Sequence, residues 1–156
     1  TPEESAKGLF MIYFFMLISF LVWGFFVPKI SKNINDAIKL LKIGTPLSLI
    51  ILGLIIYLGP DAGAIHWTLF VVAAIFLSLS QPAVGMAFTL SNAGKALTSF
   101  NLLLFVGAFF VQWMMGIIID LSMDFSFSEI IAFKFAMSFV LISSLFSYLY
   151  FLVKNN

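Results

Sequence analysis

Five long apolar runs, separated by short polar segments, make up most of this sequence. The runs 8–28, 43–60 and 96–119 contain no Asp, Glu, Lys or Arg, and 62–94 contains only His66 as a titratable residue. A run from 130 to 153 is interrupted by Lys134 alone. A helix crosses a hydrocarbon core of about 30 Å with roughly 20 residues. The pattern therefore predicts five transmembrane helices, at approximately 8–27, 38–58, 65–90, 96–119 and 130–153.

These runs predict helices because backbone polar groups in lipid must be satisfied within the segment. A membrane β-barrel would need short strands of alternating polarity, and the sequence has no such pattern. The segments between the runs are short and rich in turn-forming residues, such as Gly59-Pro60-Asp61. We therefore predict an all-α membrane protein, with residues 1–156 forming one transmembrane domain as a bundle of five helices.

The composition agrees with this prediction and excludes several classes of function. Hydrophobic residues make up 62% of the chain and charged residues only 10%, whereas an ordinary soluble domain is nearer half and a quarter. The net charge of +1 gives no basic face for nucleic acid, and the absence of Cys excludes disulfides and thiolate metal sites. The first apolar run is too long for a signal-peptide core, so we expect the chain to be a fragment of a longer protein.

The lysines predict an orientation in the membrane. One side carries six of them, Lys29, Lys32, Lys39, Lys42, Lys95 and Lys154. The other side carries Lys7 at the start of the chain, together with most of the acidic residues. Loops rich in lysine generally remain in the cytoplasm. We expect a multi-pass protein of the cell (inner) membrane, with residues 28–42, 91–95 and the C-terminus cytoplasmic.

The residues give no support for catalysis. His66 has no second His, Cys or carboxylate at ligand spacing, so a structural or interfacial role is expected. Asp120 and Asp124 stand one helical turn apart at the end of a run, as a solvated helix end would. We predict that the protein is not an enzyme and has no catalytic residue, metal site or cofactor. Lys134 lies near the end of its run, which favours snorkelling of its amine to the interface.

The informative polar residues are uncharged and lie within the third and fourth runs. In the third, Ser78, Gln81 and Gly85 fall at steps of three and four, which is one face of a helix. Pro82 follows and removes a backbone hydrogen bond, so a helix break is predicted there. In the fourth run, Asn101 and Gln112 belong to a second polar stripe.

Both polar stripes should face protein or water, because polar groups in lipid are costly. One interpretation is the wall of a substrate cavity, and the other is helix packing through small and amide side chains. The second and fifth runs are largely aliphatic or rich in Phe, Leu and Ser, without an amide in mid-span. We expect those two helices to face lipid over much of their circumference.

Two stretches resemble the major facilitator superfamily of transporters, specifically helices eight to twelve of its twelve-helix architecture. Residues 24–33 are similar to the family's cytoplasmic loop signature, with Gly24, Lys29 and Lys32 at its Gly and basic positions. Pro28 stands at the signature's acidic position. Residues 94–120 are similar to the loop and eleventh helix of the family. The resemblance extends over essentially the whole chain.

This resemblance implies the C-terminal part of a secondary transporter that moves a small solute by alternating access. It implies that the third span lines a central cavity, with Ser78, Gln81, Gly85, Asn101 and Gln112 as substrate-cavity candidates. The implied partners are the bilayer, a small solute and the missing N-terminal half of the same transporter. The alternative is a self-contained five-helix membrane scaffold or assembly protein that binds partner helices. A membrane-embedded enzyme is the least favoured alternative.

Overall fold

The computed structural model of the chain describes residues 2–155 and is almost entirely helical. The elements in chain order are α1 (Pro2–Ile30), α2 (Ile34–Leu58), the 3-10 turn η1 (Gly59–Asp61), α3 (Ala64–Ala74), the 3-10 segment η2 (Ile75–Leu79), α4 (Ser80–Met86), α5 (Leu90–Asp124) and α6 (Glu129–Lys154). Within the described residues, five stretches are long and apolar enough to cross a membrane, with α3, η2 and α4 together forming one of them. The prediction of an all-α protein with five such spans is confirmed.

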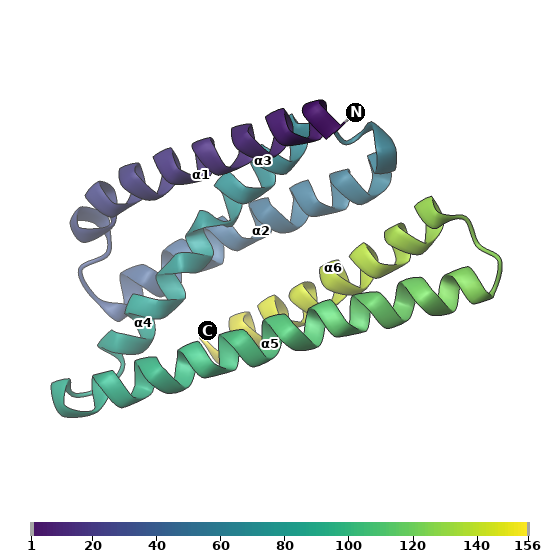
Figure 1. The fold of residues 1–156 in the computed structure, drawn as a ribbon. Coiled ribbons are helices and arrows are strands. Elements are labelled where there is room, and N and C mark those ends of the chain that lie inside the picture. The colour runs from purple at the N-terminus through teal and green to yellow at the C-terminus, as the bar shows by residue number, and fades with distance from the viewer. Residues whose placement is uncertain (1, 156) are drawn as a thin grey trace.

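Helix α2 lies at the centre of the arrangement (Figure 1). It packs against α3, η2 and α4 on one side and against α6 on the other. Helix α1 packs against α3, and the long helix α5 packs against α6 and α4. The bundle thus consists of two groups of helices, α1 with α3 and α5 with α6, which are joined through the contacts of α2 with α6 and of α4 with α5.

Helix α2 is the most buried of the five spans, and its buried residues form one stripe opposite an exposed one. Six of its residues are buried at steps of three and four, Ala37, Leu41, Gly44, Ser48, Leu52 and Ile55. None of the residues of α1 is buried, and only Ser122 of α5 is. Small residues at Ala37, Gly44 and Ser48 let neighbouring helices approach closely, which is how helices associate in lipid.

The closest packing on α2 is at Gly44. The Phe76 side chain of η2 occupies the space into which a Cβ at this position would point. On its other side the Phe76 ring meets Trp23 of α1 edge-on, with the ring centroids 4.8 Å apart. An aromatic side chain from η2 therefore fills the space between α1 and α2 only because residue 44 has no side chain.

Polar contacts join α2 to α6 near both ends. At one end, Lys134 Nζ donates a hydrogen bond to the Tyr57 carbonyl over 3.0 Å. At the other, the Tyr148 hydroxyl donates to the Lys42 carbonyl over 2.7 Å, and Lys42 Nζ donates to the Asn155 carbonyl over 2.7 Å. Lys134, which was expected to extend its amine toward the interface, reaches a carbonyl in the last turn of α2, where a cation also complements the helix dipole.

The connection between the first two spans, predicted to comprise residues 28–37, is much shorter than expected. Helix α1 continues to Ile30 and α2 starts at Ile34, so only residues 31–33 connect them. Asn33 caps α2, because its side-chain oxygen accepts from the Asp36 amide over 3.0 Å. The Asp36 carboxylate in turn accepts from the Lys32 amide over 3.1 Å. This reciprocal capping moves the helix start four residues ahead of the predicted one.

The connection after the third span is also shifted. The span was predicted to run to residue 90, but α4 ends at Met86 and residues 87–89 form the turn. Residues 91–95, predicted as a loop, form the first turns of α5. Thr89, in extended conformation, is the N-cap of α5. Ser and Asn favour helix starts as well as loops, so Ser91 and Asn92 alone did not distinguish the two.

Filling the space at Gly44 tests the packing of α2. We expect Gly44→Ala to lower the free energy of unfolding by about 1–3 kcal/mol, because the new methyl group meets the Phe76 ring. The midpoint of thermal unfolding in detergent measures this. Gly53→Ala is the control on the same helix, since a Cβ there would lie an ordinary 3.8 Å from Leu141 Cδ2. Equal midpoints for the two variants would contradict the packing.

Removing the Lys134 amine tests the contact between α6 and the end of α2. We expect Lys134→Met to lower the free energy of unfolding by about 1 kcal/mol, because the Tyr57 carbonyl loses a charged donor. Lys7→Met is the control, since Lys7 makes an exposed ion pair with Glu3 within α1. Chemical denaturation of both variants in the same micelles compares them. A larger loss for Lys7→Met would show that the helix-end contact contributes no stability.

Candidate functional site

The third span is interrupted at its middle by η2. Pro82, the predicted helix break, is the third residue of α4 and so follows this 3-10 segment closely. Because proline has no amide hydrogen, Pro82 cannot donate to the Ser78 carbonyl one turn earlier. Two serine hydroxyls donate to carbonyls of the interrupted turn, Ser78 to Ile75 over 2.7 Å and Ser80 to Leu77 over 2.7 Å. The irregular backbone therefore obtains partners from its own side chains.

The three cavity candidates of this span have different surroundings. Ser78 is half-buried and its hydroxyl is bound to the Ile75 carbonyl. Gly85 is half-buried and faces α5, where a Cβ added to it would lie 3.7 Å from Leu97 Cδ1. Gln81 is exposed, and its amide makes no hydrogen bond to any described residue. Of the three, only Gln81 presents a polar group with unused hydrogen-bonding capacity.

The two candidates on α5 also lie at the surface of the bundle. Asn101 is half-buried and Gln112 is exposed, and neither amide hydrogen-bonds to another described residue. Eleven residues separate them, which is about 16 Å along a helix. They therefore lie at different depths of the same helix and do not form one compact cluster.

The predicted loop signature belongs to the end of α1. Gly24 is exposed, with no heavy atom within 4 Å of a Cβ placed there. Lys29 lies in the last turn, with its amine 5.9 Å from the centroid of the Phe26 ring. Lys32 is one of the three connecting residues and contacts Asp36 through its backbone amide. Asp36 thus supplies a carboxylate on this connection, although Pro28 stands at the acidic position of the signature.

A hollow of about 500 Å³ lies between α2, the third span, α5 and α6. Its volume is in the range of small-molecule sites. Its lining is largely apolar and carries no charged side chain, but it includes seven hydroxyl groups, those of Thr45, Ser48, Ser80, Ser143, Ser144, Ser147 and Tyr148. The hydroxyls of Thr45, Ser144 and Ser147 make no hydrogen bond to another described residue. The hollow can therefore offer donors and acceptors to a molecule or side chain that enters it.

None of the residues that line this hollow is among the predicted cavity residues. A signal for it is present on α6, where Ser143 and Ser147 stand four residues apart, as do Ser144 and Tyr148. Such spacing places each pair on one side of a helix. On α2, Thr45 and Ser48 stand three apart, which has the same consequence. Serine is also compatible with a lipid-facing helix, so this spacing alone does not predict the hollow.

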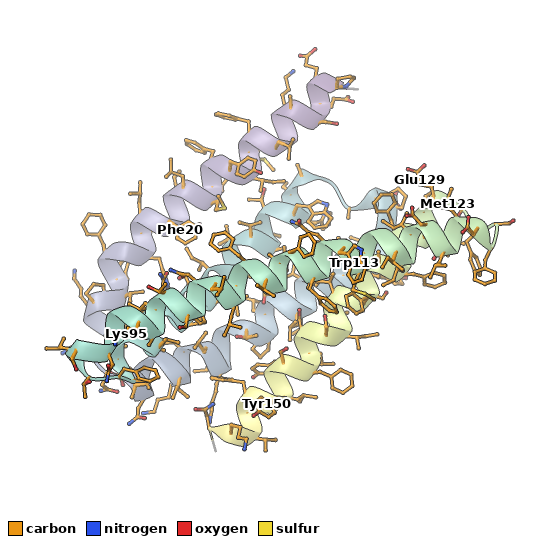
Figure 2. The ribbon with its side chains drawn as sticks, turned by 60° about the horizontal axis from the view of Figure 1, so that its bottom comes forward. Phe20, Lys95, Trp113, Met123, Glu129 and Tyr150 are labelled. Carbon is orange, nitrogen blue, oxygen red and sulfur yellow. The ribbon has the colours of Figure 1, made fainter. Side chains whose placement is uncertain are left out.

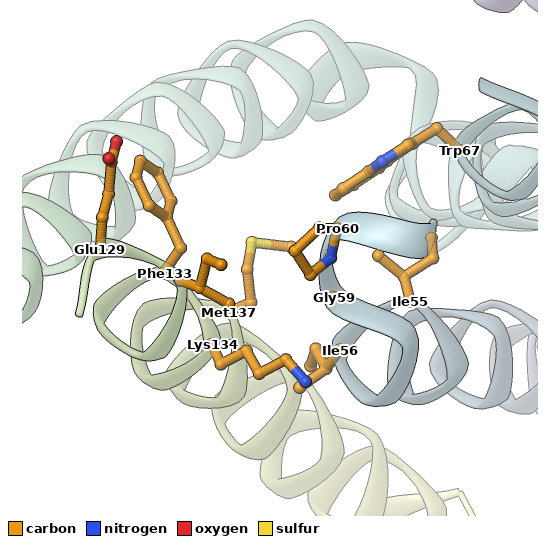
Figure 3. Close-up of a pocket in the computed structure, with 10 residues that line it drawn as sticks. Ile55, Ile56, Gly59, Pro60, Trp67, Glu129, Phe133, Lys134 and Met137 are labelled. Carbon is orange, nitrogen blue, oxygen red and sulfur yellow. The ribbon is translucent and has the colours of Figure 1, made fainter. Parts of the chain in front are cut away.

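A second hollow of about 300 Å³ lies above the C-terminal end of α2, close to the start of α6 (Figure 3). Trp67 of α3 and Phe133 of α6 are among its walls, and Glu129 lies at its edge. The Lys134 side chain runs along it toward the end of α2 and passes close to Gly59, where an added Cβ would lie 2.6 Å from Lys134 Cε. The two charged groups of this hollow lie at its rim, so its interior is apolar.

Groups suited to metal binding do not cluster in the part of the chain that the structure describes. No three His, Cys, Asp or Glu side chains of residues 2–155 lie together as metal ligands would. His66 is in the first turn of α3, and its Nδ1 is buried without a hydrogen-bond partner among the described residues. The polar groups of the two hollows and of the amide stripes can bind and orient a molecule through hydrogen bonds.

Comparison with protein-family models, with curated proteins and with solved structures finds no match for this chain.

Proposed function

We propose that this chain is the C-terminal part of a secondary active transporter, resembling the major facilitator superfamily, that moves a small solute by alternating access. The observation that carries the proposal is the pair of uncovered amides at Gln81 and Gln112. Both side chains are exposed and without hydrogen bonds to the described residues. Both belong to helices long and apolar enough to cross a membrane.

An amide in contact with hydrocarbon is expensive, because its donors and acceptors have no partner there. The surfaces around Gln81 and around Gln112 are therefore each expected to face water or further protein. A water-filled route between two groups of helices satisfies this requirement, since carriers of this kind place the solute site near the middle of the membrane. The rest of the transporter, its N-terminal half, would form the opposite wall.

The interruption of the third span supports the same function. Discontinuous helices near the midplane are a recurring feature of transporter sites, because irregular backbone is tolerated where it lines a cavity. In this chain the interruption at η2 is followed directly by Gln81 and Pro82. We assign Gln81 as the first solute contact on this helix, with Asn101 and Gln112 as contacts on α5. The lysine-rich end of the bundle would be cytoplasmic.

A scaffold that binds partner helices is the second candidate, and one observation favours it. Ser78 uses its hydroxyl within its own helix, and Gly85 packs against Leu97 of α5. Two of the five cavity candidates thus serve helix structure and packing. In a scaffold, Gln81 and Gln112 would hydrogen-bond to another helix and water would be excluded from them.

Cysteine labelling along the third span separates the two functions. The chain contains no Cys, so single Cys residues can be placed from 74 to 85 in the full-length protein without a background from this region. We expect Gln81→Cys to react with a water-soluble thiol reagent, and a transported solute to slow the reaction. Leu79→Cys is the control, because Leu79 is 1% exposed and should resist the reagent.

Resistance of Gln81→Cys equal to that of Leu79→Cys would contradict a water-filled route and favour the scaffold. If Gln81→Cys reacts and none of a panel of sugars, amino acids and organic acids slows the reaction, position 81 is hydrated but is not a site for these solutes.

A further inference from the structure

Charged residues are segregated to opposite ends of the bundle. The end formed by the C-termini of α1 and α6 and the N-termini of α2 and α5 carries six of the eight lysines, Lys29, Lys32, Lys39, Lys42, Lys95 and Lys154. Its only acidic residue is Asp36. The opposite end carries the other six acidic residues together with Lys7 and Lys134. Lys95 and Glu129 mark these two ends in Figure 2.

The few charges of opposite sign at each end are already engaged. At the acidic end, Lys7 pairs with Glu3 over 2.7 Å and Lys134 binds the Tyr57 carbonyl. At the basic end, the Asp36 carboxylate accepts from the backbone amide of Lys32 as part of the cap of α2. The ammonium groups of Lys29, Lys32, Lys39, Lys95 and Lys154 make no ion pair with a carboxylate of the described residues. Five cations at one end thus lack a counter-charge from residues 2–155.

With the five stretches placed across a membrane, these lysines fall at the level of the lipid headgroups. Each belongs to the first or last turns of a spanning helix or to the connection between α1 and α2. The amines of Lys29 and Lys154 each lie 5.9 Å from the centroid of an aromatic ring, Phe26 and Tyr150 respectively. Tyr is enriched at the membrane–water interface, so the contact with Tyr150 suits the Lys154 amine to that level, and the Phe26 ring gives Lys29 a cation–π contact.

We propose that the five lysines, Lys29, Lys32, Lys39, Lys95 and Lys154, form a binding surface for anionic phospholipid headgroups. A headgroup with net negative charge supplies the counter-charge that the five ammonium groups lack. A zwitterionic headgroup already carries a cation that neutralises its phosphate, so it supplies no net counter-charge. Each basic residue next to a spanning helix raises the affinity for anionic lipid about five-fold. The proposal is independent of transport and requires only that the helices span a membrane.

Competition between two lipids tests the proposal on the purified protein. Native mass spectrometry in one detergent compares the binding of phosphatidylglycerol with that of phosphatidylcholine of identical acyl chains. We expect phosphatidylglycerol to bind more tightly than phosphatidylcholine. The double variant Lys39→Gln/Lys95→Gln should reduce this preference about 25-fold, because each of the two lysines contributes a factor of about five. Lys7→Gln is the matched control at the acidic end and should leave the preference unchanged.

Three outcomes would overturn the proposal. Equal binding of the two lipids, or an equal loss on Lys7→Gln, would show that the basic end does not select anionic headgroups. Full competition by soluble glycerol phosphate at the same concentration as the lipid would identify a site for soluble anions. Because a misfolded variant could mimic a loss, each variant must retain the thermal unfolding midpoint of the parent in phosphatidylcholine. The single variant Lys154→Gln, at the last residue of α6, gives a further measurement should the double variant fail this requirement.

Discussion

The attachment of α2 to α6 is the constraint on which the rest of the bundle depends. In lipid, helices gain nothing from burying apolar surface against each other, so close packing and hydrogen bonds must hold them together. Polar contacts meet this need near both ends of α2, through Lys134 at one end and through Tyr148 with Lys42 at the other. The α4 segment also packs against α5, so the relative position of the two helix groups follows from these two attachments together.

The central α2 also explains where the polar groups of the candidate site lie. The Phe76 ring packs into the space at Gly44, which fixes η2 against α2 at the point where the third span is interrupted. With η2 held there, Leu79 is buried and the adjacent Gln81 is exposed. The interrupted segment, which precedes the exposed Gln81 amide and contributes Leu77 to the hydroxyl-lined hollow, is thus packed directly against α2.

The length of charge-free runs was sufficient to predict the five spans, since hydrocarbon thickness fixes the length of a spanning helix. The centre of the bundle could not be predicted in this way. Helix α2 is aliphatic from Leu47 to Leu58, and only the neighbours supplied by the fold show that its small residues are buried. Connections were overestimated because the capping residues Asn33 and Thr89 also favour loops. The hydroxyls of the hollow come from α2, α4 and α6, so their convergence depends on tertiary packing.

The packing of α2 on α6 at mid-span can be measured directly by cross-linking in native membranes. A Cβ at Gly53 would lie 3.8 Å from Leu141 Cδ2, and the chain has no Cys of its own. This packing predicts that Gly53→Cys with Leu141→Cys forms a disulfide on mild oxidation. After proteolysis between the two positions, the disulfide keeps the two fragments joined, and the joined fragments migrate more slowly in electrophoresis. Ile142 is 52% exposed, so the pair Gly53→Cys with Ile142→Cys should remain uncrosslinked. Cross-linking of the second pair in preference to the first would contradict the central position of α2.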